Sequence, residues 1–410
     1  MRHGRLIATV CGLMTYALSP ATAQCAKPAL LSVTTSTGTH QAKLLNLGSE
    51  YCWIIDQTGR QFRLKVKQIT QVKRLRSQFE PFSNTTIRDQ LRRELGRDYS
   101  VIGKGRFLVC ARPGTAEDYA QLFDQVYRKF YSFFSTRGFD LHQPEFPLVA
   151  IVIDDRKRFE NYCETDGVTP SASLSGYYLR DSNRVVLSVS SAAASHSHRS
   201  PSDGRSRRGT RVDASRLLTP LIIKPAPATD ADTVFDFNSR MSIENRALGG
   251  TDQNTIIHET THQVAFNIGI HSRVSPSPQW VIEGLATTFE APGIRDSLNR
   301  TKSQINASRY IHFGNYLEQR RKKNALENFL ASNELFTTST LDAYSEAWAL
   351  TYYLLKTRAT DYATYLKLIA GRTPESPYSS QARLEDFRKA FGSNLPLFEA
   401  AYLRFIRQIK

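Results

Sequence analysis

Beyond its first residues the chain has no apolar stretch long enough to cross a bilayer, which takes about 20 residues as a helix. The one early apolar run, residues 6–18, is too short and is interrupted by Gly12, Thr15 and Tyr16. We therefore expect no transmembrane segment once the first residues are removed, and a soluble mature protein.

The N-terminus has the order of features found in a secretory signal peptide. Arg2 and Arg5 precede the apolar run, and Ala21 and Ala23 follow it as a small-x-small cleavage site. The pattern predicts that residues 1–23 are a signal peptide and that the protein is exported, to the periplasm or outside the cell. An uncleaved N-terminal anchor is the alternative.

Cysteine is scarce, with five residues in the chain, and Cys11 would leave with the signal peptide. No two of the others, Cys25, Cys52, Cys110 and Cys163, lie within four residues of one another, which excludes a zinc knuckle. An even number of cysteines in an exported chain favours disulfides, and four cysteines allow three pairings. We expect disulfides that stabilise the N-terminal half.

Acidic residues are also few, 38 against 54 Lys and Arg, which gives a net charge of +16. Removal of the two arginines in the signal peptide leaves 16 − 2 = +14. Such a surface favours acidic partners, for example anionic envelope polymers, lipid surfaces or acidic substrates. Export and the lack of a basic and aromatic recognition motif argue against nucleic acid. A basic, solvated surface without a specific partner would also explain the charge.

The first part of the mature chain, residues 24–75, has the pattern of short β-strands. Apolar and polar residues alternate at 51–55 and at 62–66, with a turn signal at 56–59 between them. We expect a small β-barrel-like module, loosely similar to SH3-like domains. Residues 76–410 are expected to form a second domain.

The remaining pattern predicts an α+β fold for that second domain. Aromatic residues recur at helical spacing over residues 116–136, which predicts a core helix. The segment 146–153 predicts a buried strand and 176–189 predicts two strands around a turn. Beyond Asn245 apolar residues recur at helical spacing almost to the C-terminus. The segment 189–232, rich in Ser, Arg and Gly, is expected to be a flexible insertion.

Two histidines four residues apart, in the segment TIIHETTHQVAFNIG at 255–269, give the strongest functional signal. A helix places His258 and His262 on one face, about 6 Å apart along its axis, where both imidazoles can bind one zinc ion. Glu259 points about 100° away, where it can hold a zinc-bound water and take its proton during attack on a carbonyl. This is the H-E-x-x-H arrangement of zinc peptidases.

A catalytic zinc site needs a third protein ligand, and three positions can be compared. His271 lies nine residues after His262, on the opposite face of a continued helix. A metzincin would have a histidine at position 268, which is Ile268 here. Glu283 lies on a predicted second helix after a turn rich in Ser and Pro. An antiparallel second helix would return Glu283 to the two histidines.

The residues at 258–262 and 280–286 resemble the gluzincins, zinc peptidases whose third ligand is a glutamate on the following helix. The resemblance is sharpest to a bacterial peptidase-like family of undetermined substrate and covers about residues 105–405. It implies a gluzincin-like domain with a mixed sheet and a mostly helical C-terminal half. It also implies one Zn²⁺ per chain, held by His258, His262 and Glu283, with Glu259 as the general base.

Gluzincins often carry an aspartate four residues after the glutamate ligand, and this chain has Thr287 there. Glu290 or Asn254 could orient a ligand histidine in its place. Some gluzincins stabilise the oxyanion with a tyrosine or histidine from a downstream helix. Tyr344 is our first choice for this role and His312 the second.

These patterns predict an exported zinc-dependent hydrolase, a metalloprotease that acts on a peptide or protein. The alternative is a non-catalytic basic envelope protein that binds anionic polymers and has a structural or vestigial metal site. The intact Glu259 favours the enzyme, because a structural metal site has no need of a base.

Overall fold

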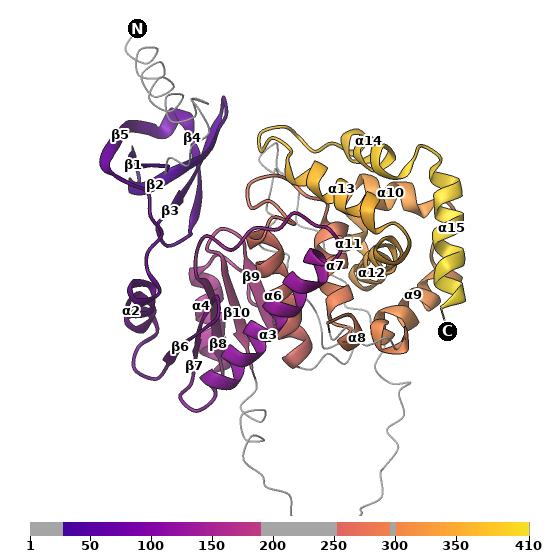
Figure 1. The fold of residues 1–410 in the computed structure, drawn as a ribbon, viewed down its shortest axis with the longest axis horizontal. Helices are drawn as coiled ribbons and strands as arrows, with labels where there is room; N and C mark the ends of the chain where they lie inside the picture. The colour runs from indigo at the N-terminus through magenta and orange to yellow at the C-terminus, as the bar shows by residue number, and fades with distance from the viewer. Residues whose placement is uncertain (1–27, 190–251, 296–300, 410) are drawn as a thin grey trace, which may run out of the picture.

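The computed structural model describes residues 28–189, 252–295 and 301–409 (Figure 1). The predicted signal peptide, Cys25 and all but the first residue of the 189–232 segment lie outside the described residues. Two sheets come first along the chain, and helices make up the described part that follows. No helix in the described ranges is long and apolar enough to cross a membrane.

The first sheet is antiparallel and has the strand order β4-β3-β2-β1-β5. Its strands are β1 (Ala29–Thr35), β2 (Gly38–Leu47), β3 (Tyr51–Asp56), β4 (Gln61–Lys65) and β5 (Ile69–Gln78). The predicted strands are therefore present, but the predicted barrel-like closure is wrong. A 3₁₀ turn, Val66–Gln68, carries the chain away from the short β4, and β5 pairs with β1 at the other edge of the sheet.

The second sheet is mixed and has the order β6-β7-β8-β10-β9. The three central strands are parallel, and both edge strands are antiparallel to their neighbours. The strands are β6 (Ser100–Lys104), β7 (Phe107–Ala111), β8 (Leu148–Ile153), β9 (Gly176–Leu179) and β10 (Arg184–Ser188). The strands predicted within 146–153 and 176–189 are confirmed.

Helices cover both faces of this mixed sheet. Successive residues of a strand point to opposite faces, so each strand contributes apolar side chains to two cores. Leu148, Ala150 and Val152 share a core with α3 (Ala116–Ser135) and α6 (Asp252–Asn267). The alternate residues Val149, Ile151 and Ile153 share a core with α2 (Asn84–Leu95) and α4 (Arg156–Thr165). The aromatic side chains of α3 are core residues, as its spacing predicts.

The C-terminal half is helical and surrounds one buried helix, α12 (Thr340–Thr357), which packs against α7 and α9. The coarse α+β class is thus confirmed. The elements that accompany α12 are α7 (Gln279–Phe289), α8 (Pro292–Arg295), the 3₁₀ turn η4 (Thr301–Gln304), α9 (Ala307–Gln319), α10 (Ala325–Ala331), α11 (Glu334–Thr338), α13 (Ala359–Ala370), α14 (Ser380–Phe391) and α15 (Leu395–Gln408).

Polar contacts join the first sheet to the rest of the chain. The Glu375 carboxylate accepts hydrogen bonds from the backbone N–H groups of Ser49, Glu50 and Tyr51, at 2.9–3.1 Å. The Gln61 N–H donates to the carbonyl of Asp181 at 2.8 Å. The first sheet ends at Gln78 and has a core of its own, and the division into 24–75 and 76–410 remains a prediction.

Cys52, Cys110 and Cys163 are buried free thiols, so the disulfide prediction is wrong for any pair among these three. Cys52 lies in the core of the first sheet, whereas Cys110 and Cys163 lie in the core beside α2 and α4. Burial raises the pKa of each thiol to about 12. Each sulfur therefore packs as a small apolar group.

A buried ion network ties three parts of the helical half together. Arg321, just after α9, donates from Nε and Nη2 to both carboxylate oxygens of Glu346 on α12, at 2.8 and 2.9 Å. Its Nη2 also lies 2.7 Å from the carboxylate of Glu399 on α15. The side chains of Arg321 and Glu346 are 2% and 1% exposed, so neither charge has water to replace its partner.

Replacing Arg321 by Met is expected to lower the free energy of unfolding by about 3–5 kcal/mol, because two carboxylates stay buried without their cation. Urea denaturation followed by circular dichroism measures the change. Arg388→Met is the matched control, since Arg388 pairs with Glu327 at the surface and should cost about 0–1 kcal/mol. Equal losses in the two variants would contradict a role for burial in this network.

Candidate metal centre

Helix α6 lies between the mixed sheet and the C-terminal helices and is buried on all sides (Figure 1). Ile256 and Val264 supply apolar contacts to the core. Its buried Thr260 and Thr261 hydroxyls donate to carbonyls four residues earlier in the helix, at 2.5 and 2.7 Å. The helix can therefore hold polar residues in the core, and the two histidines are shielded from water.

Helix α7 brings Glu283 to these histidines. A turn of Ser and Pro residues leads from α6 to Pro278, which precedes the first residue of α7. Gly284 then lets α7 lie close to α12, because a Cβ at this position would be 2.1 Å from the Thr351 Oγ1 and 2.6 Å from the Ala347 carbonyl oxygen. A glycine next to Glu283 thus fixes the distance between the two helices.

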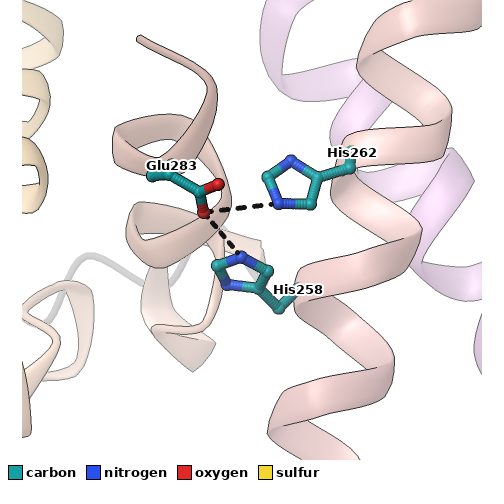
Figure 2. A group of neighbouring side chains, drawn as sticks. All are labelled: His258, His262 and Glu283. Carbon is teal, nitrogen blue, oxygen red and sulfur yellow. Dashed lines mark hydrogen bonds and ion pairs between the residues drawn. The ribbon is translucent and has the colours of Figure 1, made fainter. Parts of the chain in front are cut away.

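His258, His262 and Glu283 meet at one point, as Figure 2 shows. The Glu283 Oε2 lies 3.2 Å from the His258 Nε2 and 3.5 Å from the His262 Nε2. One ligand atom from each residue falls within 4.8 Å of the others, and all three residues are buried. The group predicted from the sequence could hold a metal ion.

The chemistry of this group fits a metal better than a purely structural contact. Among the described residues, the Glu283 Oε1 has no hydrogen-bond partner, and the His262 Nε2 has only its 3.5 Å contact with Glu283, although both atoms are buried. Burial favours the neutral carboxylic acid, but the adjacent His262 and His258 hold the pKa of Glu283 well below its usual range. Two imidazole nitrogens and an ionised carboxylate form a donor set that zinc accepts, with room for a fourth ligand.

Glu290 orients the first histidine. Its Oε1 lies 2.8 Å from the His258 Nδ1, and its Oε2 accepts a hydrogen bond from the Asn306 Nδ2 at 2.7 Å. The Arg309 Nη2 lies 3.8 Å from the same carboxylate. The sequence offered Glu290 and Asn254 as alternatives for the residue that orients a ligand histidine. In the structure it is Glu290 that contacts His258. Such a carboxylate fixes the ring so that Nε2 faces the metal position.

Asn306 and Arg309 are site residues that the sequence analysis missed. Both lie at the start of α9, and Thr287 adds no contact to His258 because its hydroxyl donates to the Glu283 carbonyl of its own helix. Arg309 is 2% exposed, but the mixed polar and apolar sequence of α9 has no pattern that marks this arginine as buried. Its partner could not be deduced from spacing.

Replacing Glu290 by Gln is expected to weaken zinc binding about 10–100-fold, the usual effect of losing the carboxylate behind a ligand histidine. Competition with a zinc-binding dye measures the affinity. Glu385→Gln, an exposed glutamate on α14, is the control. If the Glu290 variant binds zinc as tightly as that control, His258 does not depend on this contact.

Glu259 lies beside the group and is used by nothing else in the described chain. It is fully buried, and no side chain of the described residues hydrogen-bonds to its carboxylate, which only the Tyr178 backbone approaches. Burial raises the pKa of Glu259 to about 8. Folding gains nothing from a carboxyl in this position, so its presence calls for a chemical explanation.

Tyr344 lies at the centre, whereas His312 does not. The Tyr344 ring centroid is 6.3 Å from that of His258, and its buried hydroxyl has no hydrogen-bond partner among the described residues. Burial, with the nearby Glu283 and Glu259 carboxylates, raises the pKa of Tyr344 well above its ordinary value. The His312 Nε2 instead lies 3.0 Å from the carboxylate of Asp342.

Comparison with known families finds one match, to a family described as "Protein of unknown function (DUF1570)", over residues 252–376. The matched segment contains α6, α7, α9 and α12, so every residue of the candidate centre lies within its bounds. A search of curated proteins finds no match. These comparisons give no support for a gluzincin family.

Proposed function

We propose that the protein is an exported, metal-dependent hydrolase that cleaves peptide bonds, with zinc held by His258, His262 and Glu283. The observation that carries the proposal is the buried Glu259, which has no side-chain hydrogen-bond partner among the described residues and lies on the same helix as both histidines. The gluzincin resemblance supports it, because that pattern unites the same residue types at the same spacing.

In this proposal zinc supplies Lewis-acid chemistry and makes a water more acidic at neutral pH. The charge of a bound zinc ion would lower the pKa of Glu259 and favour its ionised form. That carboxylate takes a proton from the attacking water and later gives it to the leaving amine, which is the work of a general base followed by a general acid. The Tyr344 hydroxyl stays protonated and donates a hydrogen bond to the oxygen that becomes negative. Glu290 holds His258 in place throughout.

Cleavage-site profiling tests this proposal. The purified protein is incubated with a mixed peptide library, with and without a metal chelator, and the products are identified by mass spectrometry. Cleavage that stops with chelator and returns with added zinc is expected. A zinc-loaded protein that cleaves no peptide would favour the non-catalytic alternative, in which the basic surface binds anionic envelope polymers.

A further inference from the structure

A cleft of about 910 Å³ lies between four parts of the chain that are far apart in sequence. The first sheet forms one wall, the segment 137–146 and α13 form others, and the end of α6 with residues 269–274 forms the floor. Phe266, in its lining, comes one helical turn after His262, about 6 Å along the axis. One or two residues of an extended peptide span that distance.

The cleft has two arginines that form no close ion pair with a carboxylate of the described chain, although Asp181, Asp56 and Glu145 attract Arg273 from a longer distance. Arg273 donates from Nε and Nη2 to the carbonyls of Gly59, Arg180 and Asp181, at 2.8–3.2 Å, while its Nη1 makes no hydrogen bond to the described residues. Arg137 donates from Nη1 to the Phe133 carbonyl at 2.8 Å. No carboxylate of the described chain lies within 4.0 Å of either guanidinium. Two cations satisfied only by neutral oxygens favour an anionic ligand.

The acidic residues of the cleft do not cancel these cations, because each has a lysine partner. Glu145 pairs with Lys43, and Asp140 lies 3.9 Å from the Lys367 Nζ. The excess positive charge therefore belongs to the two arginines.

Two buried polar side chains of the lining also have polar atoms without partners in the described chain, although the Gln61 Nε2 donates to the Arg273 carbonyl at 3.2 Å. His271 is 3% exposed and uses neither ring nitrogen, and Gln61 is 6% exposed and leaves its Oε1 unused. A neutral imidazole offers one donor and one acceptor. Buried polar groups usually have hydrogen-bond partners, so a ligand that enters the cleft would supply the hydrogen bonds that these groups lack.

Between these polar groups the walls are apolar and aromatic, with Phe139, Leu141, Phe146 and Phe266. A ligand that fits must combine an apolar side chain with a nearby carboxylate. A short peptide segment with an aromatic residue beside an acidic one has this chemistry.

We propose that the cleft binds a carboxylate-bearing, partly apolar segment of the peptide substrate, next to the bond presented to the metal centre. The inference rests on the proposed function for the nature of the ligand. It assigns the first sheet a part in substrate recognition, because Gln61 belongs to β4 and the Gly59 carbonyl that holds Arg273 belongs to the turn between β3 and β4.

Direct binding tests the proposal without turnover. Two fluorescent hexapeptides with amidated C-termini, Ala-Ala-Phe-Glu-Ala-Ala and the same peptide with Gln for Glu, are titrated by anisotropy into chelator-treated full-length protein. The Glu peptide should bind at least about tenfold more tightly than the Gln peptide, as expected for one charge-assisted hydrogen bond. Equal affinities, or no saturable binding of either peptide, would overturn the proposal.

Two variants locate the binding. Arg273→Lys should remove most of the preference for Glu, because a lysine lacks the second arm of the guanidinium fork. Thr364→Trp, at an exposed position of α13 that lines the cleft, should weaken both peptides while the fold stays intact by circular dichroism. Lys389→Trp, on the exposed face of α14, is its control and should bind like the wild type. Binding unchanged in Thr364→Trp would place the peptide elsewhere.

The outcomes separate this inference from the proposed function. If the protein does not discriminate between the two peptides but its cleavage is still sensitive to chelator, only the proposed role of the cleft is wrong. If the peptides bind as expected but the zinc-loaded protein cleaves none of them, the proposed hydrolase function is wrong and the cleft is a peptide-binding site.

Discussion

Glu259→Gln is expected to slow peptide cleavage by about 10²–10⁴-fold, the usual contribution of a positioned general base. The amide has nearly the same shape as the carboxyl, its oxygen can still accept from the Tyr178 backbone, and no side chain of the described residues hydrogen-bonds to Glu259. The fold and the metal should therefore be unaffected. The rate is measured with the best peptide from the library, and the metal content of the same sample by plasma mass spectrometry.

The exposed Glu385→Gln variant is the control for this experiment and should keep the full rate. A fully active Glu259→Gln protein would contradict the proposed mechanism. An inactive protein that has also lost its zinc would instead make Glu259 a part of the metal site.

Glu283→Gln is expected to weaken zinc binding by more than the about 10–100-fold predicted for the residue behind His258. The substitution removes an anionic oxygen that lies 3.2 Å and 3.5 Å from the two imidazoles and leaves only neutral nitrogens. Zinc that the wild type keeps during dialysis should leave this variant. Dye competition gives the affinity, and the Glu290→Gln variant sets the scale.

The expected changes at Glu259 and Glu283 differ in kind, although both residues are buried glutamates beside the same histidines. One should lose turnover with its metal retained, and the other should lose metal first. Zinc affinity of Glu283→Gln equal to that of the wild type would show that the third ligand is another residue.

The histidine group could be predicted from the sequence because short-range geometry determines it. Four residues separate His258 from His262 on one helix, and an antiparallel second helix returns Glu283 to them. The sequence could not decide whether Glu290 or Asn254 orients a ligand histidine, and the structure shows a contact between Glu290 and His258. It depends on Asn306 and Arg309 at the start of α9, and no helical spacing relates that helix to α7.

Features that join distant segments could not be predicted. Whether the first sheet closes depends on where β5 pairs, and hairpin signals specify only neighbours in sequence. The number of cysteines favoured disulfides, yet Cys52 packs in a different core from Cys110 and Cys163. The cleft is formed by four separate segments, so neither Arg273 nor His271 had a visible partner in the sequence.

The metal content of the wild-type protein tests the central claim most directly. The full chain is purified without chelator, supplied with equal amounts of zinc and other divalent metals, dialysed and analysed by plasma mass spectrometry. The arrangement of His258, His262 and Glu283 predicts about one tightly held zinc per chain. A folded protein that retains no metal after this treatment would contradict the metal centre and every proposal built on it.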